Sequence, residues 1–183
     1  MTALLAALVG AALWSLAEYL LHRFAGHWPK GRIEFSREHL AHHAKPTYFT
    51  PTAKKARTAL TITAVVAVPV LAIFGAGVGS AGLAGFLVAY VGYELTHRLI
   101  HVRRPLGAYG RLIRRHHLHH HFAAPKKNHG VTSPIWDLLF GTYESPARVR
   151  VPARHALVWM VDSSGELLEA YAGDYELRRP KRR

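Results

Sequence analysis

The chain contains no cysteine among its 183 residues. Disulfides, thiolate zinc sites, cysteine-held iron–sulfur clusters and cysteine nucleophiles are therefore excluded, and any metal must be bound by nitrogen or oxygen. Acidic residues are scarce, with 11 Asp plus Glu against 24 Lys plus Arg and a formal net charge of +13. A disordered polycation is excluded as well, because 50% of the residues are hydrophobic.

Two long stretches carry almost no charge. Residues 2–21 hold no basic residue and one acid, Glu18. A helix of that length spans about 30 Å, the hydrocarbon thickness of a bilayer, so we expect a first transmembrane helix. A signal peptide fits this segment poorly, because no basic region precedes the apolar run.

The second apolar stretch, residues 58–96, has Glu94 as its only charge. Glycines between Gly75 and Gly82 favour a turn. We therefore expect two short spans, about residues 60–74 and 83–95, joined by a tight hairpin, which makes about three transmembrane helices in all.

The basic residues predict how these spans are oriented. Eight Lys and Arg lie in residues 23–57 and sixteen in residues 98–183, which accounts for all 24. Three spans place both segments on one side of the membrane, and the positive-inside rule makes that side the cytoplasm. This distribution explains the charge without nucleic-acid binding.

The expected fold is all-α, an integral membrane helical bundle with a histidine-rich cytoplasmic cap that holds two metals. We expect the membrane-embedded domain to cover residues 1–150. Residues 151–183 are expected to form a short basic cytoplasmic tail, whose terminal arginines lie near anionic headgroups.

Thirteen of the 14 histidines lie between residues 22 and 129, and twelve of these form four clusters. Their spacings are H-x4-H, H-x-x-H-H, H-x3-H and a dense run that again contains H-x-x-H-H. Positions i, i+3 and i+4 share one face of a helix, so one turn can offer three imidazoles to one point. The clusters are His22 and His27; His39, His42 and His43; His97 and His101; and His116, His117, His119, His120 and His121.

About ten imidazoles exceed what one zinc ion needs, so the supply suits two metal ions. Ligation by nitrogen alone also suits a redox metal, because a thiolate ligand could itself be oxidised. All four clusters lie on the expected cytoplasmic side, next to a span or just beyond it. A substrate that reaches the metals from the bilayer would be a lipid.

Two further segments accompany the clusters: Glu38-His39-Leu40-Ala41-His42-His43 followed by Pro46-Thr47-Tyr48-Phe49, and Asn128 to Thr142 with Trp136-Asp137 before Phe140-Gly141-Thr142. From about Glu18 to Tyr143 the chain resembles the fatty acid hydroxylase and sterol desaturase superfamily, which are membrane-bound histidine-box non-haem di-iron oxygenases. The resemblance implies two iron ions, O2-dependent oxidation of a lipid C–H bond, and an external redox partner such as a cytochrome b5-like protein, a ferredoxin or a reductase.

The resemblance also implies ten metal ligands: His22, His27, His39, His42, His43, His97, His101, His117, His120 and His121. In the last box His116, His119 and His120 fit the same spacing. The frame with His117, His120 and His121 is preferred, since the family pattern places an aromatic directly after the paired histidines and Phe122 follows His121. A metal contact stays open for His129, and His155 is expected to be solvated.

Three carboxylates are candidates for orienting the metal-binding imidazoles without binding the metal themselves. Glu18 and Glu94 precede His22 and His97 by about one turn, and Asp137 lies in the family segment. The two intramembrane acids could equally hydrogen-bond another helix.

The substrate stays open among fatty acyl chains, sterols and carotenoids. The segment from Trp136 to Thr142 favours the fatty acid hydroxylase and sterol desaturase branch over carotenoid hydroxylases. A membrane protein that binds or transports metal is the alternative from another class, but it would want more polar residues inside the spans than residues 60–95 offer.

Overall fold

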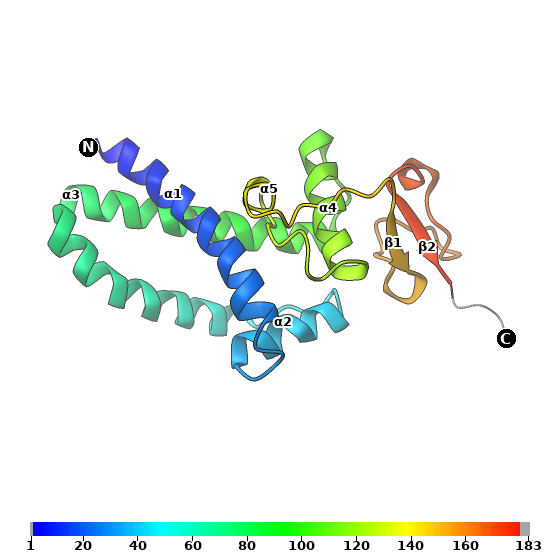
Figure 1. Ribbon diagram of the computed structural model, residues 1–183, viewed down its shortest axis with the longest axis horizontal. Coiled ribbons are helices and arrows are strands. Elements are labelled where there is room, and N and C mark those ends of the chain that lie inside the picture. Colours follow the sequence, from blue (N-terminus) through cyan, green and yellow to red (C-terminus); the bar gives the residue numbers. More distant parts are fainter. Residues whose placement is uncertain (1, 180–183) are drawn as a thin grey trace. The chain divides into compact units, whose positions relative to one another are not determined.

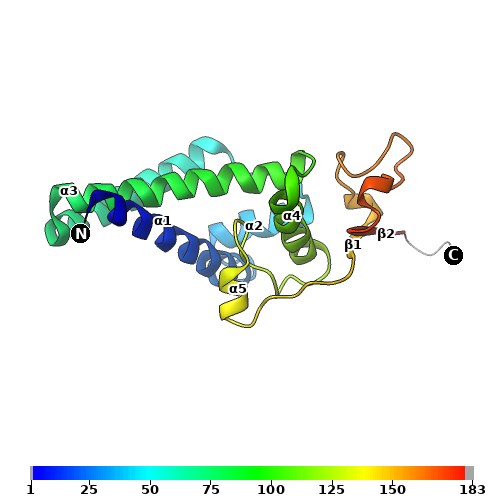
Figure 2. The same cartoon turned by 90° about the horizontal axis from the view of Figure 1, so that it is seen from above.

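The computed structural model describes residues 2–179 and is mostly helical. The elements are α1 (Ala3–Leu20), a π-helical turn (Leu21–His27), α2 (Glu34–Ala44), α3 (Thr52–Val102), α4 (Gly107–Phe122), α5 (Ile135–Leu139), β1 (Val149–Pro152), two 3-10 turns (Ala153–His155 and Glu169–Tyr171) and β2 (Tyr175–Arg178) (Figures 1 and 2). The chain forms two compact units, one of Met1–Glu18 with Phe49–Leu95 and one of Tyr19–Tyr48 with Thr96–Arg183.

In the first unit, α3 folds back on itself (Figure 1). Gly75, at φ 72° and ψ 165°, is its one residue with non-helical angles. The ammonium of Lys55 lies 2.5 Å from the carboxylate of Glu94, whereas a straight helix would separate these residues by roughly 60 Å. The expected hairpin is confirmed, but its turn is shorter than expected, because the chain is helical again directly after Gly75.

The helix α1 packs closely on the second limb of α3. A Cβ at Gly10 would lie 2.0 Å from the carbonyl oxygen of Gly82, and one at Gly85 would lie 2.0 Å from that of Ala7. Further along α1, the ring of Trp14 contacts Phe86, Tyr90 and Tyr93. Small residues thus let the two backbones touch, as in helix pairs that associate within a membrane.

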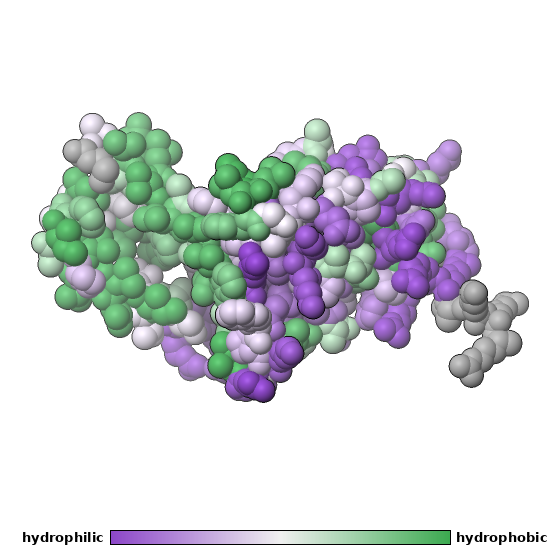
Figure 3. Space-filling view, in the orientation of Figure 1, coloured by the Kyte–Doolittle hydropathy of each residue, from purple (hydrophilic) through white to green (hydrophobic). Residues whose placement is uncertain are grey.

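The outer surface of the first unit is apolar. Large hydrophobic side chains of α1 and of both limbs of α3 are exposed, among them Leu8, Val65 and Val88, and α1 and α3 are largely green in Figure 3. Two continuous helical stretches, Ala3–His27 and Thr52–Val102, are long and apolar enough to cross a membrane. The two later spans that the sequence predicts correspond to the two limbs of α3 on either side of Gly75, and three crossings of a membrane stay a prediction.

In the second unit, Arg114 joins the end of α3 to α4. This side chain is 5% exposed, and its guanidinium donates to the carbonyl oxygens of Leu99, Arg103 and Gly110. The indole of Trp159 donates to the carbonyl of Ile100. Carbonyls at the end of α3 lack helical partners, so these donors fix where α3 ends beside α4.

Residues 151–179, the described part of the expected tail, hold strands and turns, and the terminal residues 180–183 lie outside the described residues. Strands β1 and β2 pair in parallel with Val149 opposite Tyr175, which is a small exception to the all-α expectation. Val149, Val151 and Met160 are fully buried there. These residues belong to the same compact unit as α4, and the domain boundary expected at residue 150 stays a prediction.

Candidate metal centre

The ten histidines expected to bind metal form two groups in the second unit. Within each group, one ring nitrogen of every histidine lies within 4.8 Å of the others. Group A consists of His22, His27, His39, His43 and His120, and group B consists of His42, His97, His101, His117 and His121. The preferred frame of the last box therefore supplies the grouped residues, and His116 and His119 lie outside both groups.

Each H-x-x-H-H box serves both groups. His39 and His43 enter group A whereas His42 enters group B, and in the last box the roles are exchanged. The expectation that one turn offers three imidazoles to one point is therefore wrong. Residues i and i+4 point within about 40° of each other on a helix, but adjacent residues diverge by about 100°, so the middle histidine must face a second site.

The π-helical turn Leu21–His27 explains the H-x4-H spacing. A π-helix closes its turn between residues i and i+5, which places His22 and His27 on one face. Gly26 lies inside this turn, and a Cβ there would be 2.9 Å from Cδ2 of His39. The absence of a side chain at this position lets His39 enter group A.

The separations of the ring nitrogens are close to those of ligands around one ion. In group A, Nε2 of His27 lies 2.8 Å from that of His39 and 2.9 Å from that of His120. In group B, the Nε2 atoms of His42 and His97 are 3.0 Å apart. Two ligands at about 2.1 Å from one metal, at tetrahedral or octahedral angles, lie about 3.0–3.4 Å apart.

Backbone carbonyls fix the tautomers of three of these histidines. The Nδ1–H of His22 donates to the carbonyl of His129 at 2.5 Å, that of His42 to Tyr48 at 2.7 Å, and that of His120 to Lys127 at 2.6 Å. Since a carbonyl only accepts, each Nδ1 carries the proton and each Nε2 presents a lone pair. Nε2 of His22 is buried without a hydrogen-bond partner among the described residues.

Burial keeps these imidazoles neutral. It lowers the pKa of His43 to about 3, with further contributions from neighbouring imidazoles. The pKa of His39 and the pKa values of His117, His120 and His121 are well below their ordinary range for the same reasons. A neutral imidazole is the form that binds a metal, so the centre is prepared for cations at neutral pH.

The donor set fits metal ions in both groups. Buried, neutral imidazoles whose lone pairs converge repel one another unless a cation lies between them. Nitrogen ligands of this kind suit iron, zinc, copper and nickel.

The three carboxylates that we expected to orient the imidazoles belong to neither histidine group. Asp137 is fully buried and accepts hydrogen bonds from His116 Nε2 and from the backbone N–H of His129. Glu94 forms an ion pair with Lys55, and Glu18 is buried within α1.

Three further histidines lie outside both groups. The ring of His129 lies near group A, 5.2 Å from that of His120 between centroids. His119 faces Glu144 at 3.2 Å. His155 is half-buried, stacks on Phe122 and belongs to neither group.

The sequence did not point to the groups that support the histidines. The carbonyls of Tyr48, Lys127 and His129 carry no side-chain pattern, so no spacing could reveal them. Ser36 was also missed, although its hydroxyl donates to the carbonyl of Gly26 at 2.7 Å and so braces the π-helical turn.

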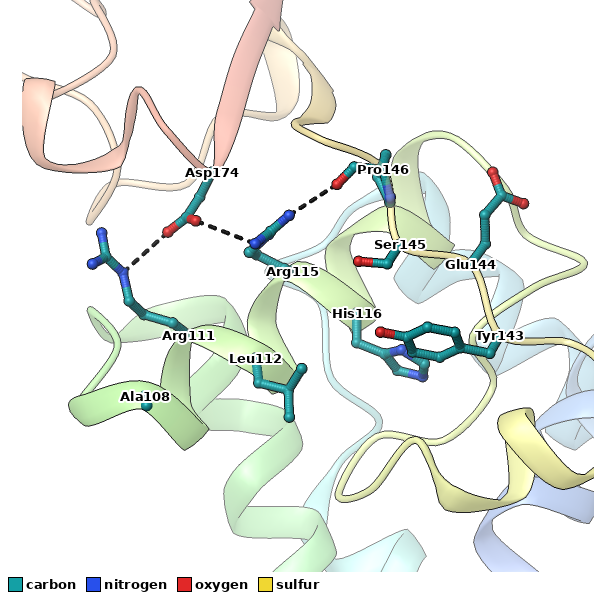
Figure 4. Close-up of a pocket in the computed structure, with 10 residues that line it drawn as sticks. All are labelled: Ala108, Arg111, Leu112, Arg115, His116, Tyr143, Glu144, Ser145, Pro146 and Asp174. Carbon is teal, nitrogen blue, oxygen red and sulfur yellow. Dashed lines mark hydrogen bonds and ion pairs between the residues drawn. The ribbon is translucent and has the colours of Figure 1, made fainter.

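A cavity of about 280 Å³ lies elsewhere in the second unit (Figure 4). Arg111 and Arg115 border it and both pair with Asp174, and His116 stacks under Tyr143. None of the ten grouped histidines lines this cavity, so it is separate from the candidate metal centre.

Comparison with known proteins identifies the family. The family model for fatty acid hydroxylases matches residues 7–142, and the chain belongs to this family. It is similar to the dihydroceramide fatty acyl 2-hydroxylase of Arabidopsis thaliana, with 32% identity over 149 residues, which cover 73% of the chain and 58% of that relative. It is also 32% identical to the human fatty acid 2-hydroxylase, over 74% of the chain and 38% of that relative.

A solved structure supports the same fold. It is described as full-length scs7p with only the hydroxylase domain visible, and it matches with a TM-score of 0.64 and 31% sequence identity over 80% of this chain and 59% of that chain. The chain thus spans about two fifths to three fifths of the length of these relatives.

Proposed function

We propose that the protein is a membrane-bound oxidoreductase that hydroxylates a lipid C–H bond with two histidine-held iron ions, O2 and electrons from a separate donor. The observation that carries this proposal is the pair of five-histidine groups in a chain of the fatty acid hydroxylase family. The reaction consumes the C–H bond, O2, two electrons and two protons, and it yields the alcohol and water.

The substrate that we propose is a fatty acyl chain, either free or in a ceramide-type lipid, hydroxylated at its 2-position. This rests on the relatives described above, which are named as a dihydroceramide fatty acyl 2-hydroxylase and a fatty acid 2-hydroxylase. A carotenoid or sterol substrate finds no such support among them.

The apolar surface of α1 and α3 supports a location in a membrane. We propose that these helices cross the bilayer, with the histidine groups and the basic residues on the cytoplasmic side. A substrate that reaches the metals from the bilayer would then be a lipid.

The residues of the chain bind and orient the metals and exclude water. Group A and group B would each hold one ion, and the ions when bound would supply the activation of O2. The carbonyls of Tyr48, Lys127 and His129 keep three imidazoles in the tautomer that binds metal. The electron donor would be a cytochrome b5-like protein, a ferredoxin or a reductase, since basic loops suit an acidic partner.

The test is incorporation of isotopically labelled oxygen. Membranes that contain the protein would receive 18O2, NADPH, a reductase and a cytochrome b5, and their acyl chains would be analysed by mass spectrometry. We expect 2-hydroxy acyl chains with one 18O atom, which are absent with His42→Ala or His120→Ala and retained with the control His155→Ala. Equal product in all variants would contradict the proposal, and metal-dependent ion flux without oxygen consumption would favour transport.

A further inference from the structure

The loop of residues 127–130 supplies backbone carbonyls that accept hydrogen bonds from two histidines of group A. Its Lys127 carbonyl accepts the Nδ1–H of His120, and its His129 carbonyl accepts the Nδ1–H of His22. His120 and His22 both belong to group A. In group B, His42 uses the carbonyl of Tyr48 from another segment. The two groups therefore differ in what orients their imidazoles.

Asp137 holds this loop in place. Its carboxylate is fully buried and accepts from the N–H of His129 at 2.8 Å, the N–H of Gly130 at 2.7 Å, the hydroxyl of Thr142 at 2.7 Å and Nε2 of His116 at 3.0 Å. Burial by itself would raise the pKa of Asp137, but these four hydrogen bonds outweigh it, and the pKa lies below its ordinary value. The group is therefore a buried anion at neutral pH.

One peptide group connects this anion to group A. The carbonyl that accepts from His22 and the N–H that donates to Asp137 Oδ2 both belong to the peptide that links His129 to Gly130. A carboxylate bound to the N–H of a peptide polarises it, so its carbonyl becomes a stronger acceptor. A stronger acceptor orients the His22 ring and makes its Nε2 a better ligand, as carboxylates do when they bind metal-ligating histidines directly.

Glycine at position 130 is needed for this geometry. A Cβ at Gly130 would lie 2.1 Å from the carbonyl oxygen of Ser133 and 3.1 Å from Asp137 Oδ2. Any larger residue would push the loop away from the carboxylate and lengthen the connection to His22.

We propose that Asp137 is a positioning residue for group A, which acts on His22 through the His129–Gly130 peptide and thereby sets the metal affinity of that group alone. The inference rests on the proposed function, because it requires that the two groups bind metal. Under this proposal the two groups differ in what sets their metal affinity. Asp137 acts on group A although the Asp137 carboxylate contacts no grouped histidine directly.

The first experiment measures metal release from the purified holoprotein in detergent as a chelator is added. His39→Ala and His97→Ala identify which release phase belongs to group A and which to group B. With Asp137→Asn we expect the affinity of group A to fall 10- to 100-fold, the range found for such outer partners, while group B keeps its affinity. Equal weakening of both groups, or no change in either, would overturn the proposal.

A double-mutant cycle separates this action from general support of the fold. If Asp137 acts through His22, then Asp137→Asn changes the affinity of group A little once His22→Ala is present. The same fold-loss in both backgrounds would mean that Asp137 only holds the structure, and would overturn the proposal.

Two matched variants probe the path itself. His129→Ala keeps the backbone carbonyl and N–H, so both ions should be retained. Thr142→Val removes the bond to Oδ1 but leaves the bond between Oδ2 and Gly130, so its effect should be small beside that of Asp137→Asn. Loss of the group A ion in His129→Ala would show that the His129 ring is itself a ligand. It would overturn the proposal that Asp137 acts through the His129–Gly130 peptide. Wild-type protein that holds no metal would instead refute the proposed function, so the two failures are distinguishable.

Discussion

Gly26 shows at the scale of one residue how closely the centre is packed. Because a Cβ there would lie 2.9 Å from Cδ2 of His39, Gly26→Ala must displace that ring. We predict that this variant loses the ion of group A while its helical content is preserved. Metal analysis with circular dichroism checks this. Gly92→Ala, where nothing lies within 4 Å of the new Cβ, is the matched control and should retain both ions.

The ten grouped histidines were predicted from the spacing of the clusters together with the family resemblance, because spacing alone left two frames open in the last box. The way in which histidines of different segments combine into two groups was not predictable, since it depends on how α2, α4 and the end of α3 face one another. The carbonyls behind His22, His42 and His120 were also beyond prediction, because every residue has one. Asp137 was singled out from the sequence, but its partners, His116, Thr142 and two backbone N–H groups, were not, and its role stays a prediction.

The buried imidazoles predict how the metal-free protein responds to acid. The pKa of His43 falls from 6.5 in the unfolded chain to about 3 in the folded one, so the unfolded state binds more protons below pH 6.5. The stability that neutral His43 contributes is present above pH 6.5 and is lost as the pH falls toward 3. We expect the melting temperature of chelator-treated protein in detergent to decrease steadily from pH 6.5 downward. A melting temperature independent of pH over this window would contradict the burial of the centre.

Among the elements, we expect the join between α3 and α4 to position group B, because His97 and His101 lie near the end of α3 and His117 and His121 lie on α4. Arg114 binds three carbonyls there, and a hydrogen bond to a charged group is worth about 1.5–3 kcal/mol. Arg114→Met should therefore destabilise the protein by roughly 3 kcal/mol and weaken the group B ion more than the group A ion. Thermal melting and metal release measure the two effects. An unchanged group B would show that the join does not position His97 and His101.

The contact between α1 and α3 yields a separate prediction. A side chain at Gly85 would meet the backbone of Ala7, and overpacking of this kind costs about 1–3 kcal/mol or more. We expect Gly85→Val to lower the melting temperature clearly, whereas Gly77→Ala, with no atom within 4 Å of the new Cβ, should not. Equal melting temperatures for the two variants would contradict the close approach of the helices.

The elements were predictable where their pattern is long and local. The apolar runs and the glycines at residues 75–82 gave α1 and the hairpin. The π-helical turn Leu21–His27 was not anticipated, because it depends on His22 and His27 facing one site. The parallel pair β1 and β2 was missed too, since each strand has four residues and their pairing joins segments far apart in the chain.

The whole molecule combines an apolar helical unit with a second unit that contains both histidine groups. This combination supports the proposal that the substrate is a lipid of the bilayer. Family membership alone would support the proposed chemistry of this chain only by analogy. The two groups of five converging imidazoles add a physical basis for metal binding.

Metal content per chain tests the central claim most directly. Protein extracted gently from membranes should contain two iron ions per chain by elemental analysis. His120→Ala should lose the ion of group A, His42→Ala should lose the ion of group B, and His155→Ala should keep both. Substoichiometric metal in the wild type, or two ions retained in both grouped variants, would contradict the account.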